Sequence, residues 1–164
     1  ASLFRSIRVH GQGSDRYENV RLGLTGRLDT IQAAILIPKL GIFPDELVER
    51  QRVATTYEKL ISSSTIDVIT PQVPDGFYSA WAQYSVLAVD QTARQAILDR
   101  LKLAGVPTMI YYERPLHMQK AFANLNYKAG DFPVSEQASN RIFSLPMHPY
   151  LDDKSIAFIV EAMA

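Results

Sequence analysis

The sequence predicts an α/β fold in which a small sheet is flanked by helices and preceded by a long, broken helical segment. Three observations support this prediction. Residues 22–61 have a helical pattern, residues 81–89 have the pattern of a strand, and a helix at 92–104 leads into a strand at 108–112. Strand, helix and strand within about thirty residues form an α/β unit. The sequence leaves open whether its strands are parallel or antiparallel.

The composition is that of an ordinary soluble globular protein. Of the 164 residues, 47% are hydrophobic and 21% are charged, which suffices for a continuous core. Seventeen basic residues balance seventeen acidic ones, so no net field attracts nucleic acid or a membrane surface. The lack of cysteine excludes disulfides and Cys-based zinc sites and fits a reducing compartment. No apolar run approaches the roughly 20 residues of a membrane span. We therefore expect a cytoplasmic protein.

The N-terminal part combines a short apolar and basic segment with a polar loop. The chain begins with Ala1 and enters residues 3–9 directly, and this beginning suggests a part of a longer protein. The apolar positions of residues 3–9 fit either a strand or the end of a helix. Residues 10–19 are rich in Gly, Ser, Asp and Asn, which predicts a loop. Arg16 and Arg21 give this loop binding potential, although most polar loops are only solvated.

Residues 22–61 predict two helices. The first helix has a wide apolar face that other protein must cover, formed by Leu28, Ile31, Ile35 and Leu36. It ends at Pro38 and Gly41, and Pro44 opens the second helix with an acidic first turn. The second helix has its own apolar stripe, formed by Leu47, Ala54, Tyr57 and Ile61.

The middle of the chain predicts the sheet. Residues 66–73 are a short extended connector. Residues 81–89 are partly apolar on both faces, so we expect a strand inside the sheet. The helix that follows begins near Asp90 and ends at Gly105, where a left-handed cap is expected. Residues 108–112 form the next strand.

The C-terminal part predicts further helices. A short helix opens at Pro115, and residues 133–143 form a longer one with Glu136 in its first turn. Residues 144–151 are extended because two prolines prevent a helix there. Asp152 caps a last helix. The inward residues of this helix are Ile156, Ile159, Val160 and Met163.

Without reference to a family, the chain has few candidates for chemistry. His10, His117 and His148 lack a second histidine or carboxylate at helical spacing, so we expect no metal site. Each is more simply explained as a hydrogen-bonded imidazole. The dinucleotide, P-loop and serine-hydrolase motifs are absent from the sequence. Tyr111 and Tyr112, with the charged pair that follows them, form a better cluster at a strand end, where α/β units bind ligands. The alternative is a partly buried aromatic pair.

The segment GLTGRLDTIQAA at residues 23–34 resembles the DegT/DnrJ/EryC1/StrS family, the pyridoxal-phosphate sugar aminotransferases of fold type I. Further motifs follow the order of that family: HGQ at 10–12 before Arg16, WAQY at 81–84, GVP at 105–107, Tyr112, PLH at 115–117 and SLPMHPYL at 144–151. Each motif is weak alone, but their order and spacing together are specific. The chain most resembles the branch that aminates UDP-linked N-acetylated keto-sugars for surface polysaccharides.

The resemblance implies a C-terminal small domain of a fold-type I transferase at residues 45–164. Residues 1–44 would be a remnant of the large-domain end, with a loop and a dimer-site helix. The cofactor of the family, pyridoxal 5'-phosphate, is held by a lysine in the large domain, and no lysine here stands in that context. We therefore expect no catalytic residue in this chain and no activity from it alone. The parent enzyme would transfer an amino group from glutamate, as a homodimer with shared active sites.

The resemblance also implies the site residues. Thr25 stands where the family commonly has an asparagine that reaches the cofactor phosphate of the partner subunit, and a hydroxyl donates one hydrogen bond with a shorter reach. Arg27 matches a family arginine near the same site, where its guanidinium suits phosphate or carboxylate. Tyr112 matches a tyrosine of the substrate cleft. The implied substrate-binding residues are Arg27, Tyr111, Tyr112, His10 and Arg16.

A function of another class is a stand-alone, non-catalytic binding or dimerisation module. The position of the start codon would distinguish this module from the enzyme. In either case the apolar face at Leu28, Ile31 and Ile35 is explained by core or dimer packing, and it predicts self-association.

Overall fold

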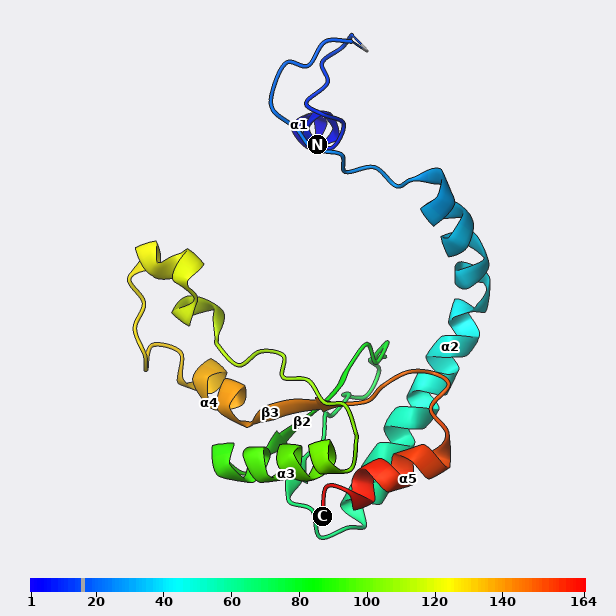
Figure 1. Ribbon diagram of the computed structural model, residues 1–164, viewed down its shortest axis with the longest axis vertical. Coiled ribbons are helices and arrows are strands. Elements are labelled where there is room, and N and C mark those ends of the chain that lie inside the picture. Colours follow the sequence, from blue (N-terminus) through cyan, green and yellow to red (C-terminus); the bar gives the residue numbers. More distant parts are fainter. Residues whose placement is uncertain (16) are drawn as a thin grey trace. The chain divides into compact units, whose positions relative to one another are not determined.

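A computed structural model describes residues 1–15 and 17–164 and divides the chain into two units, Ala1–Pro44 and Asp45–Ala164 (Figure 1). The long helix α2, Thr30–Ser62, contributes residues to both units. Each unit has its own internal contacts and is described by itself.

The first unit begins with helix α1, Ser2–Ile7, and continues as a loop that folds back on it. Isolated bridges pair Val9 with Thr25 and Gln12 with Asn19. The Leu24 N–H donates a hydrogen bond of 2.8 Å to the carbonyl oxygen of Ile7. Of the two alternatives for residues 3–9, the structure therefore shows a helix through Ile7.

The prediction of two helices in residues 22–61 is wrong, because α2 is one helix of 33 residues that contains Pro38 and Pro44. An internal proline removes one hydrogen bond and favours a bend, but helix-forming residues on both sides can continue the helix. Gly41 does not adopt the left-handed conformation that ends a helix. Pro38, Gly41 and Pro44 therefore lie inside one continuous helix and do not mark the helix boundary that the sequence predicted.

The second unit contains the sheet. It has three strands in the order β1-β2-β3, namely Val68–Ile69, Tyr84–Ala88 and Ile142–Leu145. Both pairings are antiparallel, with Val68 opposite Ala88 and Tyr84 opposite Leu145. The prediction that the strand in residues 81–89 is internal is confirmed, and the orientation that the sequence left open is antiparallel.

Two predicted elements of this unit are wrong. Residues 108–112 form no strand, and only Met109 makes an isolated bridge, with Ser144. The third strand is instead β3, whose first two residues were assigned to a helix that actually ends at Arg141. The periodicity of a short apolar run after a helix does not show where the helix ends. Here residues 142–145 pair with β2, so the helix ends before them and they form a strand.

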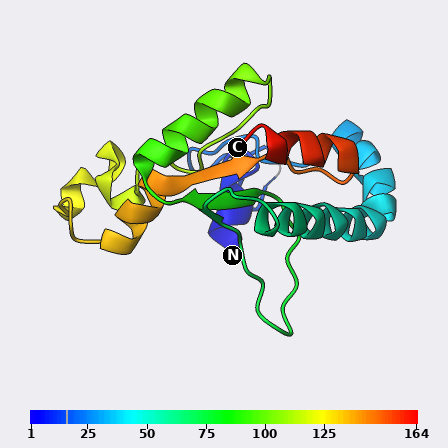
Figure 2. The ribbon, with the colours of Figure 1, turned by 90° about the horizontal axis from the view of Figure 1, so that it is seen from below.

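The helices of the second unit lie along the sheet and beyond one of its ends (Figure 2). They are α3, Gln91–Leu103; η1, Leu116–Met118; η2, Lys120–Leu125; α4, Pro133–Arg141; and α5, Asp153–Glu161. The predicted cap of the last helix is confirmed, because Asp152 accepts from the Ser155 N–H at 2.7 Å. Asp90, near which α3 was expected to begin, is the N-cap of that helix and accepts from the Ala93 N–H at 2.8 Å.

The core lies between the sheet and α2, α3 and α5. Its largest fully buried side chains are Tyr57, Tyr84, Phe143, Leu101, Ile156, Met163, Val53 and Val86. The inward residues predicted for the last helix are all buried, as are three of the four in the second stripe of α2. The exception is Leu47, which is half-buried.

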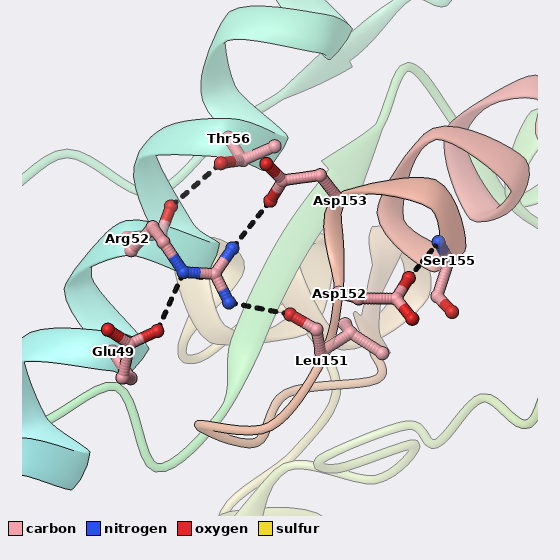
Figure 3. Close-up of polar contacts among 7 residues, drawn as sticks. All are labelled: Glu49, Arg52, Thr56, Leu151, Asp152, Asp153 and Ser155. Atoms are coloured by element: carbon pink, nitrogen blue, oxygen red, sulfur yellow. Dashed lines mark hydrogen bonds and ion pairs between the residues drawn. The ribbon is translucent and has the colours of Figure 1, made fainter.

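Arg52 joins α2 to the start of α5 (Figure 3). Its guanidinium donates to Glu49 at 2.7 Å, to Asp153 at 2.5 Å and to the carbonyl oxygen of Leu151 at 2.7 Å. A planar fork with several donors can satisfy all three acceptors at once. This contact links the start of α5 to α2 in addition to the apolar packing of α5.

Candidate functional site

The residues implied in binding lie in two places, a loop of the first unit and a cavity of the second unit. His10, Thr25 and Arg27 belong to the loop. Tyr111 and Tyr112 line the cavity. Arg16 lies outside the described residues.

The loop brings Thr25 against His10. The two residues are 15 positions apart, and the Oγ1 atom of Thr25 lies 3.2 Å from Nε2 of His10. The backbone supports this contact, because the His10 N–H donates to the carbonyl oxygen of Leu24 at 3.1 Å. The Gly26 N–H donates to the carbonyl oxygen of Arg8 at 2.8 Å.

Two glycines allow the loop to close on itself. Gly11 has a φ of +76°, and a Cβ atom there would collide with the carbonyl group of Arg21. A Cβ atom at Gly23 would collide with the backbone of His10 and Gly11. Backbone segments approach this closely only where no side chain intervenes. The geometry of Thr25 therefore depends on glycine at both positions.

The donors of this loop suit an anion. Thr25 offers a hydroxyl and Arg27, two residues later, offers an exposed guanidinium. A hydroxyl and a guanidinium are both groups that bind phosphate in proteins. The residues present therefore fit the phosphate of pyridoxal 5'-phosphate.

The cavity of the second unit has a volume of about 770 Å³, within the range of sites for small molecules. Its wall comes from residues 111–142 and is mostly aromatic and aliphatic. The lining residues include Tyr111, Tyr112, Arg114, Leu116, His117, Phe122, Leu125, Tyr127, Phe132 and Ile142. The structure therefore brings the predicted tyrosine pair to a cavity together with Arg114.

The two tyrosines present different amounts of surface. Their rings are in edge contact, with centroids 5.7 Å apart. Tyr111 is half-buried, whereas Tyr112 is 72% exposed. Glu113, the fourth member of the sequence cluster, does not line this cavity.

His117 lines the cavity and contacts Glu136, and neither residue was predicted as part of a site. Nε2 of His117 lies 3.0 Å from Oε1 of Glu136, and the His117 side chain is only 8% exposed. Hydrogen bonds from the backbone of Gly130, then from Phe132 and from the side chain of His117, lower the pKa of Glu136. The sequence shows one sign of this role, an acidic residue in the first turn of a helix, where backbone N–H groups are unsatisfied.

In residues 1–15 and 17–164, no group of three or more His, Asp or Glu side chains is arranged to hold a metal ion. None of the described helices is both long and apolar enough to cross a membrane.

Comparison with known proteins gives consistent matches. The chain is 43% identical over 163 residues to the UDP-2-acetamido-2-deoxy-3-oxo-D-glucuronate aminotransferase of Pseudomonas aeruginosa. This match covers 99% of the chain and 43% of that protein. It is 40% identical over 165 residues to a pleiotropic regulatory protein of Geobacillus stearothermophilus, covering 100% of this chain and 43% of that protein.

A solved structure has the same fold. It is a DegT DnrJ EryC1 StrS aminotransferase from Brucella abortus, with a TM-score of 0.83, 41% identity, and coverage of 99% of this chain and 42% of that one. The chain thus spans less than half of the length of these relatives. Since the match to the family extends over residues 1–164, the chain belongs to the DegT/DnrJ/EryC1/StrS aminotransferase family.

Proposed function

We propose that this chain works as the C-terminal part of a pyridoxal-phosphate-dependent enzyme that transfers an amino group from glutamate to a UDP-linked keto-sugar. The family match over residues 1–164 carries this proposal. The name of the relative with 43% identity supports the choice of a UDP-linked keto-sugar. In this proposal the unit Asp45–Ala164 is the small domain, and Ala1–Pro44 is the end of the large domain. The pathway would be surface polysaccharide synthesis, in the cytoplasm.

The loop of the first unit would hold the cofactor. When bound, pyridoxal phosphate supplies the electron sink for amino transfer. The Thr25 hydroxyl would donate to its phosphate, and Arg27 would neutralise charge at the same place or on the sugar nucleotide. The contact of 3.2 Å with His10 orients the hydroxyl of Thr25. Arg16, which lies outside the described residues, stays a candidate for substrate binding.

The cavity of the second unit would bind the substrate. Tyr111 and Tyr112 offer aromatic faces and hydroxyl groups, which suit a sugar or a base ring. Arg114 also lines the cavity and would attract an anionic substrate. This combination of an apolar wall with a few polar groups is typical of small-molecule sites.

The enzyme would be a homodimer with shared active sites. Large apolar side chains of the first unit are exposed in the single chain, with Ile31 76% exposed and Ile35 55% exposed. A helix face of this kind needs a covering surface. A second copy would supply it and would place the loop of one subunit at the site of the other.

The test is an assay of the complete enzyme, which includes the part of the relatives that this chain does not span. Incubation with pyridoxal phosphate, glutamate and UDP-linked 3-keto-N-acetyl sugars should give an amino sugar, detected by mass spectrometry. Arg27→Gln should lower kcat/KM at least about tenfold, the effect of losing one charged contact. Arg5→Gln, a change of the same kind in α1, is the matched control. Absence of any amine product would refute the proposal.

The regulatory name of the relative with 40% identity favours a second candidate, a non-catalytic binding or dimerisation module. The same assay separates the two. A complete protein that binds UDP-sugars or self-associates, yet forms no amine with any keto-sugar, would be the module. Turnover would exclude it.

A further inference from the structure

Glu136 accepts hydrogen bonds from three separate segments, and two of the donors, Phe132 and His117, line the cavity that holds the tyrosine pair. Its carboxylate accepts from the Gly130 N–H at 2.9 Å and from the Phe132 N–H at 3.3 Å. It also meets Nε2 of His117 at 3.0 Å. Glu136 lies in the first turn of α4, Gly130 in the preceding loop and His117 in η1. One side chain thus ties the loop and η1 to a helix.

The carboxylate decides which nitrogen of His117 carries the proton. An ionised carboxylate can only accept hydrogen bonds, so its partner Nε2 must be the donor. In the neutral imidazole the other nitrogen, Nδ1, is then an acceptor. The described residues give His117 no polar contact other than the one with Glu136.

Aromatic packing fixes the plane of the imidazole. The centroids of the His117 and Phe132 rings are 4.8 Å apart, and the Phe132 ring meets Tyr127 edge-on at 5.0 Å. Phe132 also donates its N–H to Glu136. The same carboxylate therefore controls both the proton position of His117 and the residue on which its ring packs.

We propose that Glu136 is a positioning residue that holds His117 with its proton on Nε2, so that Nδ1 is an acceptor for a ligand in the aromatic cavity. The ligand group would be a hydroxyl or amide N–H beside an apolar ring face, as in an N-acetylated sugar. Only the identity of this ligand depends on the proposed function. The proton position is a property of the chain without ligand.

The proton position can be measured by ¹⁵N NMR of the histidine side chains in the full chain, at alkaline pH where imidazole is neutral. The chain has three histidines, and His10→Gln and His148→Gln assign the signals. We expect His117 to carry its proton on Nε2, with that proton protected from exchange. Glu136→Ala should speed its exchange about tenfold or more, as expected for loss of a charge-assisted bond. Glu161→Ala, at the end of α5, is the matched control.

Glu136→Gln is a second variant for the case that Glu136→Ala misfolds. Its amide oxygen can still accept hydrogen bonds from the backbone, while the charge is lost. In this variant the proton on Nε2 of His117 should exchange faster than in the native chain. A proton on Nδ1 in the native chain would overturn the proposal. So would unchanged exchange in folded Glu136→Ala.

Kinetics of the complete enzyme test the ligand step. Glu136→Ala should raise KM for the keto-sugar about tenfold and leave KM for glutamate unchanged. An equal change in both values, or no change, would overturn the ligand role of His117. A native enzyme that forms no amine would instead refute the proposed function, and the NMR result would be unaffected.

Discussion

At the scale of single residues, the two stacked tyrosines of the core differ in one hydrogen bond. Tyr57 and Tyr84 are both buried, with ring centroids 4.9 Å apart. The Tyr57 hydroxyl donates to the carbonyl oxygen of Pro146 at 3.0 Å. The Tyr84 hydroxyl has no partner within the described residues. Burial raises the pKa of both phenols, so each stays neutral.

This difference predicts that replacing each tyrosine by phenylalanine affects the free energy of unfolding differently. Tyr57→Phe should lower the free energy of unfolding by about 1–2 kcal/mol, because it loses a buried hydrogen bond and leaves an acceptor unsatisfied. Tyr84→Phe should be neutral or slightly stabilising, because it removes a buried hydroxyl that bonds to nothing. Urea unfolding of the two variants gives the comparison, and equal losses would contradict it.

Glu136 predicts a pH dependence with a definite sign. Its pKa is lower in the folded chain than the ordinary 4.5, chiefly because of the Gly130 N–H. Its stabilising contribution is therefore complete above about pH 4.5 and is lost as pH falls through the lower, folded value. Urea unfolding at pH 5 should show a lower free energy of unfolding for Glu136→Gln than for the native chain. The difference should shrink at more acidic pH, and a difference that grows there would contradict the assignment.

At the scale of elements, local chemistry predicted the helix starts well and the strand limits poorly. Asp90 and Asp152 are capping residues whose effect is confined to one turn, so the sequence reveals them. The strand β3 depends on pairing with β2, which lies more than fifty residues earlier. No local pattern records such a partner. For the same reason, residues 108–112 have the composition of a strand and form none.

Two glycines that were both read as helix ends offer a test of this distinction. A Cβ atom would meet open space at Gly41 and at Gly105, but only Gly105 has a positive φ, +74°. Gly41→Ala should therefore stabilise helix α2 by about 0.5–1 kcal/mol, and Gly105→Ala should destabilise the chain by about 1 kcal/mol. Circular dichroism during urea unfolding measures both. A destabilising Gly41→Ala would show that α2 is interrupted there.

At the scale of the whole molecule, the candidate site is predictable only in part. The resemblance indicated Arg27, Tyr112 and the position of Thr25, because these belong to family motifs. Tyr111 was singled out with Tyr112 for its place at the end of a predicted strand, and the pair lines a cavity although residues 108–112 form no strand. His117 and Glu136 are 19 residues apart in the sequence, and their contact joins η1 to α4. The two residues carry no common motif, and each has an ordinary local explanation. Only the folded chain brings them together.

The exposed apolar face of the first unit predicts self-association of the chain. Large side chains there remain exposed, among them Leu28 at 62%, Ile31 at 76% and Ile35 at 55%. Burying such a patch against a second copy would remove apolar surface from water. Sedimentation velocity should show a dimer whose fraction rises with concentration, and Ile31→Glu with Ile35→Glu should shift the chain to monomer. Leu103→Glu, at a residue 91% exposed in the second unit, is the matched control and should leave the dimer intact. A monomer at all concentrations would remove the support for shared active sites.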